Sequence, residues 1–152
     1  PFTSWIMLNG MATLDLRCRA MATSAHRIAA ALQGDARIGF VRYPALASHP
    51  QHALAMAQMD GSGGTLVTFD LVGGKDAAFA FCNALDIIKI SNNLGDAKSI
   101  ATHPATTTHS RLTPEQKDQQ GITPGLIRLS VGLEDTDDLI ADLTSALNAI
   151  AQ

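Results

Sequence analysis

The chain has 152 residues, of which 46% are hydrophobic and 16% are charged, and its formal net charge is −3. This length suits one domain with a single core. The chain lacks both the excess of lysine and arginine typical of nucleic-acid binding and an apolar run long enough to span a membrane, so we expect neither kind of partner.

The two cysteines, Cys18 and Cys82, lie far apart and form no C-x-x-C pair. This usage favours a reducing compartment, the cytoplasm, over a disulfide-rich secreted protein. The N-terminus also lacks the basic and apolar regions of a signal peptide. It begins Pro-Phe-Thr-Ser-Trp rather than with methionine, which suggests a fragment of a longer protein.

Residues 1–34 are predicted to form one long helix that ends at Gly34. Apolar residues recur at spacings of four and three, which places them on one helical face and favours a helix lying along its own domain over a coiled coil. They are Met7, Met11, Leu14, Cys18, Met21, Ala25, Ile28 and Leu32. We expect Phe2, Trp5 and Ile6 at the helix start to be covered by another surface.

Short strands and helices alternate after this helix. Strands are predicted at 37–43, 65–71, 87–91, 99–103 and 126–131. Helices are predicted at 51–59, at 75–85, from Pro114 with Thr113 as its cap, and after a cap at Asp135 or Thr136. We expect the last helix to bury a stripe of Leu139, Leu143, Leu147 and Ile150.

The strands carry polar residues on one face, as where Thr68 and Asp70 alternate with Val67, Phe69 and Leu71. This alternation favours a mainly antiparallel sheet with helices on one side over a doubly wound parallel sheet. The predicted fold class is therefore α/β, in the form of an α+β sandwich preceded by a long helix.

Most potential reactive residues have structural interpretations. The histidines lack the cysteine pairs or acidic ligands of a metal site, so we expect no metal. Cys82 falls on an apolar helical stripe and is interpreted as a core residue. The glycine runs 61–64 and 73–74 lack phosphate-loop spacing and predict turns. The histidines considered as ligands are His49, His52, His103 and His109.

Arg128 differs because it lies inside a predicted strand, 126–131. Ile127, Leu129 and Val131 occupy one face, so the guanidinium projects from the other. A partly buried guanidinium needs a carboxylate or phosphate partner. The pattern alone leaves two alternatives open, an ion pair with an acid of the last helix and the binding of a ligand.

Several blocks, taken in order, resemble one enzyme family. Residues 126–135, Leu-Ile-Arg-Leu-Ser-Val-Gly-Leu-Glu-Asp, are similar to the closing signature of the cystathionine gamma-synthase family, the pyridoxal-phosphate enzymes of cysteine and methionine metabolism. Segments 94–99 and 103–109 resemble two further family blocks. Residues 1–5 with the helix at 14–17 resemble the passage from the family's large domain into its small one.

The resemblance implies a fold and a domain organisation. The family has the aspartate-aminotransferase-like fold, fold type I of the pyridoxal-phosphate enzymes. Residues 1–34 would be a long interdomain helix, and 35–152 the small C-terminal domain that covers the active site. The large cofactor-binding domain would be absent from this chain. Its expected partners are that missing domain and a second copy in a homo-oligomer.

The resemblance also implies site residues. Arg128 corresponds to the residue that binds the α-carboxylate of an amino-acid substrate, and Asn93 and Leu94 fall where the family places a second contact. The family's Schiff-base lysine lies ahead of this chain. We therefore expect pyridoxal phosphate in the full-length parent only, no catalytic residue here and no turnover by this chain alone. The lysines that lack the family setting are Lys75, Lys89, Lys98 and Lys117.

Within the family, segments 91–96 and 109–115 are most similar to the sulfhydrylases that act on O-succinylhomoserine. The implied parent activity replaces succinate by sulfide and yields homocysteine for methionine biosynthesis. One alternative is a methionine gamma-lyase, or a cystathionine lyase or synthase, of the same family. Another is a non-catalytic binding module derived from such a domain.

Overall fold

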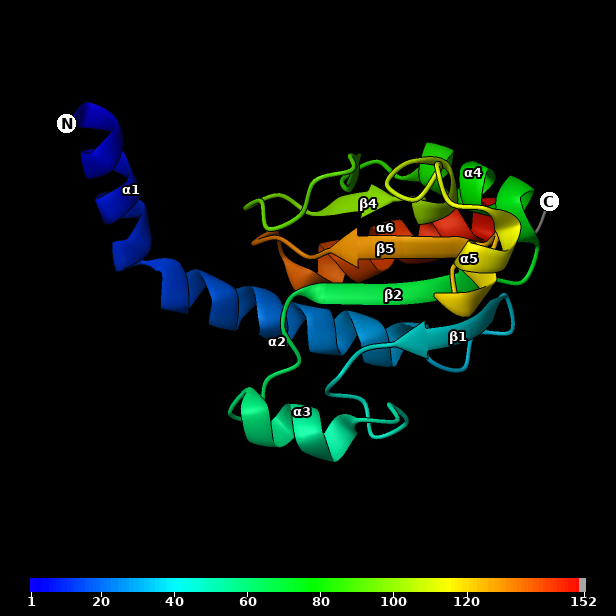
Figure 1. The fold of residues 1–152 in the computed structure, drawn as a ribbon, viewed down its shortest axis with the longest axis horizontal. Coiled ribbons are helices and arrows are strands. Elements are labelled where there is room, and N and C mark those ends of the chain that lie inside the picture. Colours follow the sequence, from blue (N-terminus) through cyan, green and yellow to red (C-terminus); the bar gives the residue numbers. More distant parts are fainter. Residues whose placement is uncertain (151–152) are drawn as a thin grey trace.

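The computed structural model describes residues 1–150 and places five strands in one sheet (Figure 1). The strands are β1 (Ile38–Arg42), β2 (Leu66–Leu71), β3 (Lys89–Ile90), β4 (Ile100–Thr102) and β5 (Leu126–Ser130). Their order is β1-β2-β5-β4-β3, and every neighbouring pair is antiparallel except β3 with β4. The expected mainly antiparallel sheet is confirmed.

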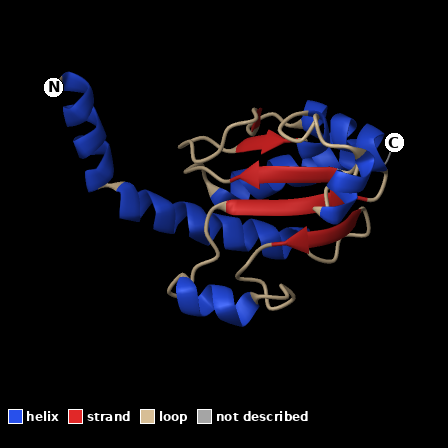
Figure 2. Cartoon of the chain, in the orientation of Figure 1, coloured by secondary structure: helices blue, strands red, loops and turns tan. Residues whose placement is uncertain are grey.

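Three of the helices cover one face of this sheet. The helices are α1 (Phe2–Ala12), α2 (Leu14–Leu32), α3 (His52–Gln58), α4 (Gly74–Ala84), η1 (Pro104–Thr106), α5 (Pro114–Gln119) and α6 (Thr136–Ile150). Figure 2 shows α2, α4 and α6 behind the sheet, with α5 on the opposite side and α3 beyond the edge strand β1. Within residues 1–150, no helix is long and apolar enough to span a membrane.

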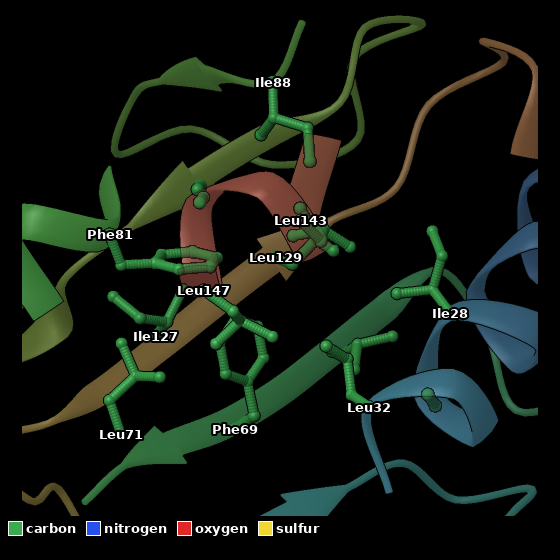
Figure 3. Close-up of a cluster of buried hydrophobic side chains, with 14 of the residues drawn as sticks. Ile28, Leu32, Phe69, Leu71, Phe81, Ile88, Ile127, Leu129, Leu143 and Leu147 are labelled. Atoms are coloured by element: carbon green, nitrogen blue, oxygen red, sulfur yellow. The ribbon is translucent and has the colours of Figure 1, made fainter. Parts of the chain in front are cut away.

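The core lies between the sheet and these three helices. Apolar side chains that alternate along β2 and β5 point towards the helices, and the Phe69 and Phe81 rings meet edge to face with centroids 5.6 Å apart. Burial of such side chains supplies most of the stabilising free energy. Figure 3 labels ten members of the cluster, which are Ile28, Leu32, Phe69, Leu71, Phe81, Ile88, Ile127, Leu129, Leu143 and Leu147.

The single long helix expected over 1–34 is wrong, because two helices meet at Thr13. In Figure 1, α1 leaves the direction of α2 and points away from the sheet. Asn9 and Gly10 are poor helix formers, and α1 buries no residue that would hold it in line. Only the C-terminal half of the predicted stripe is buried, whereas Met7, Met11, Leu14 and Cys18 are exposed.

Local sequence signals fix other element ends as predicted. Asp135 caps α6 by accepting the N–H of Asp137 at 2.8 Å. Thr113 and Gln116 form a reciprocal capping box at the start of α5. Within α6, Leu139, Leu143 and Leu147 are buried as expected, and Ile150 is half-buried.

The second face of the sheet is partly covered by the chain between β4 and β5. The Thr123 hydroxyl donates to the Asp70 carboxylate. His103 is buried, with Nδ1 2.8 Å from the Thr106 hydroxyl and Nε2 2.8 Å from the Pro124 carbonyl. These contacts hold the segment with η1 and α5 over one end of the face.

Candidate functional site

Arg128 stands at the centre of β5, between Thr68 on β2 and Thr102 on β4. Its neighbours Ile127 and Leu129 are buried in the core, so their packing fixes the backbone that carries it. Because side chains alternate along a strand, Arg128 projects from the face opposite the long helices. The structure confirms this predicted direction.

The Arg128 guanidinium is held by the loop that follows β3, residues 91–99, which we call the Arg128 loop. Its Nη2 donates to the carbonyl oxygen of Asn92 at 3.0 Å and to that of Asn93 at 3.1 Å. Its Nε is buried and has no hydrogen-bond partner within residues 1–150. A buried donor without an acceptor costs free energy, so Nε is a place where an anionic ligand would be stabilised.

The alternative of a structural ion pair is not realised in the described part of the chain. Ion pairs join Arg19 to Asp15, Arg27 to Asp137 and Arg37 to Asp35, and none includes Arg128. Helix α6 lies behind the sheet (Figure 1), whereas Arg128 alternates with the core residues Ile127 and Leu129 and so projects to the other side. The arginine is therefore free of a carboxylate partner within residues 1–150.

The structure brings Asn93 to Arg128, but through its backbone. The Asn93 carbonyl accepts the arginine hydrogen bond, and the Asn93 N–H donates to the Ser91 hydroxyl at 3.3 Å. Leu94 follows with 56% of its surface exposed. The predicted proximity of this segment to Arg128 is confirmed. The contact itself was not predictable, because every residue type has a backbone carbonyl.

Hydrogen bonds fix this loop against the end of β5. The Gly95 N–H donates to the Ser130 hydroxyl at 3.0 Å, and the Leu133 N–H donates to the Ala97 carbonyl at 2.9 Å. Ser99 meets Glu134 at the end of the loop. The strand that carries Arg128 and the segment after it therefore also hold the loop. Ser99 and Glu134 were not among the predicted site residues.

The other candidates have structural roles. Within residues 1–150, no three His, Cys, Asp or Glu side chains gather in the manner of a metal site. Burial raises the pKa of Cys82 to about 11, which suits the interpretation as a core residue. The ring of His52 lies 3.0 Å from the Pro44 carbonyl, and that of His49 accepts the N–H of Gln51.

Three sizeable surface hollows lie elsewhere. One of about 600 Å³ lies between α2 and the loop before β2, one of about 480 Å³ lies beside β1, and one of about 440 Å³ lies beside α5 and His103. Arg128 lines none of them. A ligand at Arg128 would therefore rest on an open face of this chain rather than in an enclosed pocket.

Three of the four lysines have partners away from Arg128, whereas Lys98 lies on the Arg128 loop itself. Lys89 Nζ donates to the Asp86 carbonyl at 2.6 Å and Lys117 Nζ to the Ala105 carbonyl at 2.9 Å, and Lys75 Nζ lies over the Phe79 ring. None of these contacts includes Arg128 or its loop. We therefore assign no step to the cofactor on the residues of this chain.

Comparisons with known proteins give a consistent result. A sequence model of the family described as "Cys/Met metabolism PLP-dependent enzyme" matches residues 1–148. An O-succinylhomoserine sulfhydrylase of Mycobacterium tuberculosis is 51% identical over 151 residues, and the alignment covers 97% of this chain and 37% of that protein. An L-methionine gamma-lyase of Pseudomonas putida is 44% identical over 99% of this chain and 38% of its own length.

A solved structure shows the same fold. The cystathionine gamma-lyase from yeast superposes with a TM-score of 0.96 at 36% sequence identity, over 100% of this chain and 39% of that one. The agreement confirms the predicted small-domain fold of fold type I. The chain thus spans less than two fifths of the length of these relatives.

Proposed function

Because this chain belongs to the family of pyridoxal-phosphate-dependent enzymes of cysteine and methionine metabolism, we propose that it is the substrate-binding small domain of a sulfhydrylase. The parent enzyme would convert O-succinylhomoserine and sulfide into homocysteine and succinate. The 51% identity to an O-succinylhomoserine sulfhydrylase supports this substrate over the others in the family.

One observation carries the proposed role of the domain, namely the buried and unpartnered Nε of Arg128 on a rigid strand. A planar guanidinium binds a carboxylate through two parallel hydrogen bonds. In this structure Nη2 already donates hydrogen bonds to the carbonyl oxygens of Asn92 and Asn93. A substrate carboxylate that pairs with Nε and Nη2 would share Nη2 with this loop or displace one of the carbonyls.

We propose that Asn93 and Leu94 complete the substrate site. Asn93 is in contact with the guanidinium, and Leu94 is exposed next to it in the chain. The loop would then have two roles, which are to orient Arg128 through its carbonyls and to border the carboxylate. Binding on an open face agrees with a site that the rest of the parent completes.

The remainder of the parent would hold the cofactor. Bound pyridoxal phosphate serves as an electron sink for carbanions formed from amino acids, and the protein contributes binding and orientation. The part played by this chain is to fix the substrate's carboxylate so that its reacting atoms face the cofactor. The free thiols of Cys18 and Cys82 support a cytoplasmic parent.

An assay of the full-length parent tests the substrate. The purified enzyme is incubated with O-succinylhomoserine and sulfide, and separately with methionine or cystathionine without sulfide. We expect homocysteine and succinate to form faster than any 2-oxo acid. Efficient release of a 2-oxo acid from methionine, with little use of O-succinylhomoserine, would identify a lyase instead, which the 44% identity to an L-methionine gamma-lyase makes the second candidate.

A further inference from the structure

Glu134 joins the start of β4 to the segment after β5. Its Oε1 accepts the backbone N–H of Ser99 at 2.7 Å, and its Oε2 accepts the Ser99 hydroxyl at 2.8 Å. Ser99 is fully buried, so the carboxylate satisfies two donors that water cannot reach. Hydrogen bonds to an ionised acceptor are stronger than those between neutral groups.

The Ser99 hydroxyl extends the contact in a second direction. Its oxygen accepts the N–H of Gly132 at 2.8 Å while its proton serves Glu134. A Cβ atom at Gly132 would lie 2.5 Å from both the Ala97 carbonyl oxygen and Glu134 Oε2, so only glycine allows the segments to approach so closely. Glu134, Ser99 and Gly132 form one connected unit, which we call the Glu134 clamp.

The Glu134 clamp lies at one end of the loop that orients Arg128. The carbonyls of Asn92 and Asn93 hold the arginine Nη2 at the other end, and Gly95 is tied to Ser130 between them. The loop is therefore hydrogen-bonded at one end to Arg128 on β5 and at the other end, through the clamp, to the segment that follows β5. A shift of the loop at Ser99 moves the carbonyls that determine where the guanidinium points.

We propose that Glu134 is a positioning residue for the substrate carboxylate and acts through Ser99, the loop and Arg128. This inference rests on the proposed function, because it assigns Glu134 a role in the same binding site. Glu134 contacts Ser99 rather than Arg128 and stands at the far end of the loop. Loss of its charge should therefore reduce substrate binding without abolishing the chemistry that follows.

The test uses Glu134→Gln in the full-length parent, assayed with the amino-acid substrate that the enzyme uses best. Glutamine keeps an oxygen for the Ser99 N–H but replaces the acceptor of the Ser99 hydroxyl by an NH₂ group. We expect KM to rise about tenfold and kcat to change by about twofold or less. The matched control is Glu115→Gln, which makes the same change on α5, where no side-chain hydrogen bond within residues 1–150 joins Glu115 to Arg128 or its loop.

A double variant separates positioning from general destabilisation. If Glu134 acts through Arg128, Glu134→Gln should cause little further loss in kcat/KM when Arg128 is already alanine. If Glu134→Gln does not fold, Ser99→Ala keeps Glu134 but removes the hydroxyl through which it acts, and should raise KM in the same way, with its own additivity test against Arg128→Ala.

The results distinguish failure of the proposed function from failure of the role assigned to Glu134. A normal kcat/KM for Arg128→Ala would contradict the proposed function itself. A defective Arg128→Ala together with a normal KM for Glu134→Gln would overturn only the role of Glu134. Fully additive losses in the double variant would also overturn it, because independent effects on folding add whereas effects through one shared residue do not.

Discussion

Arg128 and Asn93 lie 35 positions apart, yet the guanidinium Nη2 of the first donates to the carbonyl oxygen of the second at 3.1 Å. The pairing joins the middle strand of the sheet to a loop at its edge. It orients the arginine while its Nε keeps no partner within residues 1–150. An oriented cation with an unused buried donor is a suitable anchor for a carboxylate.

The Asp35 carboxyl should give the chain an acid-sensitive contribution to stability. Hydrogen bonds from the Arg37 side chain lower the pKa of Asp35 to about 2. Since the unfolded value is about 3.9, the contribution is present above pH ~4 and is lost as the pH falls towards 2. The pair is partly exposed, so we expect it to contribute about 1 kcal/mol or less.

Thermal melts of Asp35→Asn at a series of pH values measure this contribution. Asparagine keeps an oxygen for the Arg37 N–H, so the variant reports the charge. Its Tm should lie below that of the unmodified chain at pH 7 and converge with it near pH 2. Asp118→Asn is the control, because Asp118 makes no ion pair within residues 1–150. A constant difference across the pH range would contradict the assignment.

The two thiols should differ in reactivity. Burial raises the pKa of Cys82 to about 11, whereas Cys18 is exposed on α2. The thiolate is the reactive form, so at pH 8 a thiol reagent should modify one residue per native chain and two per unfolded chain. Mass spectrometry of the labelled peptides identifies which residue reacts. Rapid labelling of native Cys82 would show that the core around it opens.

The helix α1 should recruit another surface. It buries none of its residues, and Phe2 and Trp5 are 72% and 59% exposed with their rings stacked. Exposed apolar patches favour association, so we expect the chain to form dimers or larger assemblies through α1. Sedimentation velocity over a range of concentrations measures this assembly. Phe2→Ser should weaken it without lowering the Tm of the domain.

Trp5 also provides a direct readout, because it is the only tryptophan of the chain. Iodide should quench its fluorescence in the dilute chain and less in the associated form. A strictly monomeric chain with Trp5 shielded from iodide would rule out association through α1.

The predicted long helix shows what apolar periodicity can and cannot predict. Its spacing of apolar residues correctly marked Met21, Ala25, Ile28 and Leu32 as buried. The same spacing continues to Met7, but periodicity cannot say whether a partner surface exists to cover it. Strand β5 and the cap of α6 were predictable because alternation and capping are local signals.

The candidate site was predictable only in part. Arg128 stood out because its neighbours on β5 are apolar and a charge among them needs a partner, but the pattern left open whether that partner is an ion pair or a ligand. The contact from Asn93 uses a backbone carbonyl, and the support from Glu134 depends on Ser99, 35 positions away. Hydrogen bonds between residues so far apart in the sequence can be identified only once the three-dimensional structure is known.

The lysines should not anchor the cofactor in this chain. Lys75, Lys89 and Lys117 each contact groups unrelated to Arg128, and Lys98 lies on the Arg128 loop without the Ser/Thr-rich setting of the family's Schiff-base lysine. After incubation with pyridoxal phosphate and dialysis, we expect no retained visible absorption band of an imine. A retained band that disappears on substitution of one particular lysine by alanine would show that this chain holds the cofactor by itself.

The central claim is that Arg128 binds the substrate carboxylate, and Arg128→Ala in the full-length parent tests it. Hydrogen bonds to charged groups are worth about 1.5–3 kcal/mol, so we expect kcat/KM to fall at least about ten- to a hundredfold. Arg128→Lys should restore only part of the loss, because an ammonium group cannot form the planar two-pronged contact.

The most direct test measures both kcat/KM and Tm of Arg128→Ala. We predict a large loss of kcat/KM with only a small decrease in Tm, because the guanidinium has no ion-pair partner within residues 1–150 and the substitution removes only its hydrogen bonds to the Asn92 and Asn93 carbonyls. A normal kcat/KM with a clearly lowered Tm would show that Arg128 is structural, and would contradict the account.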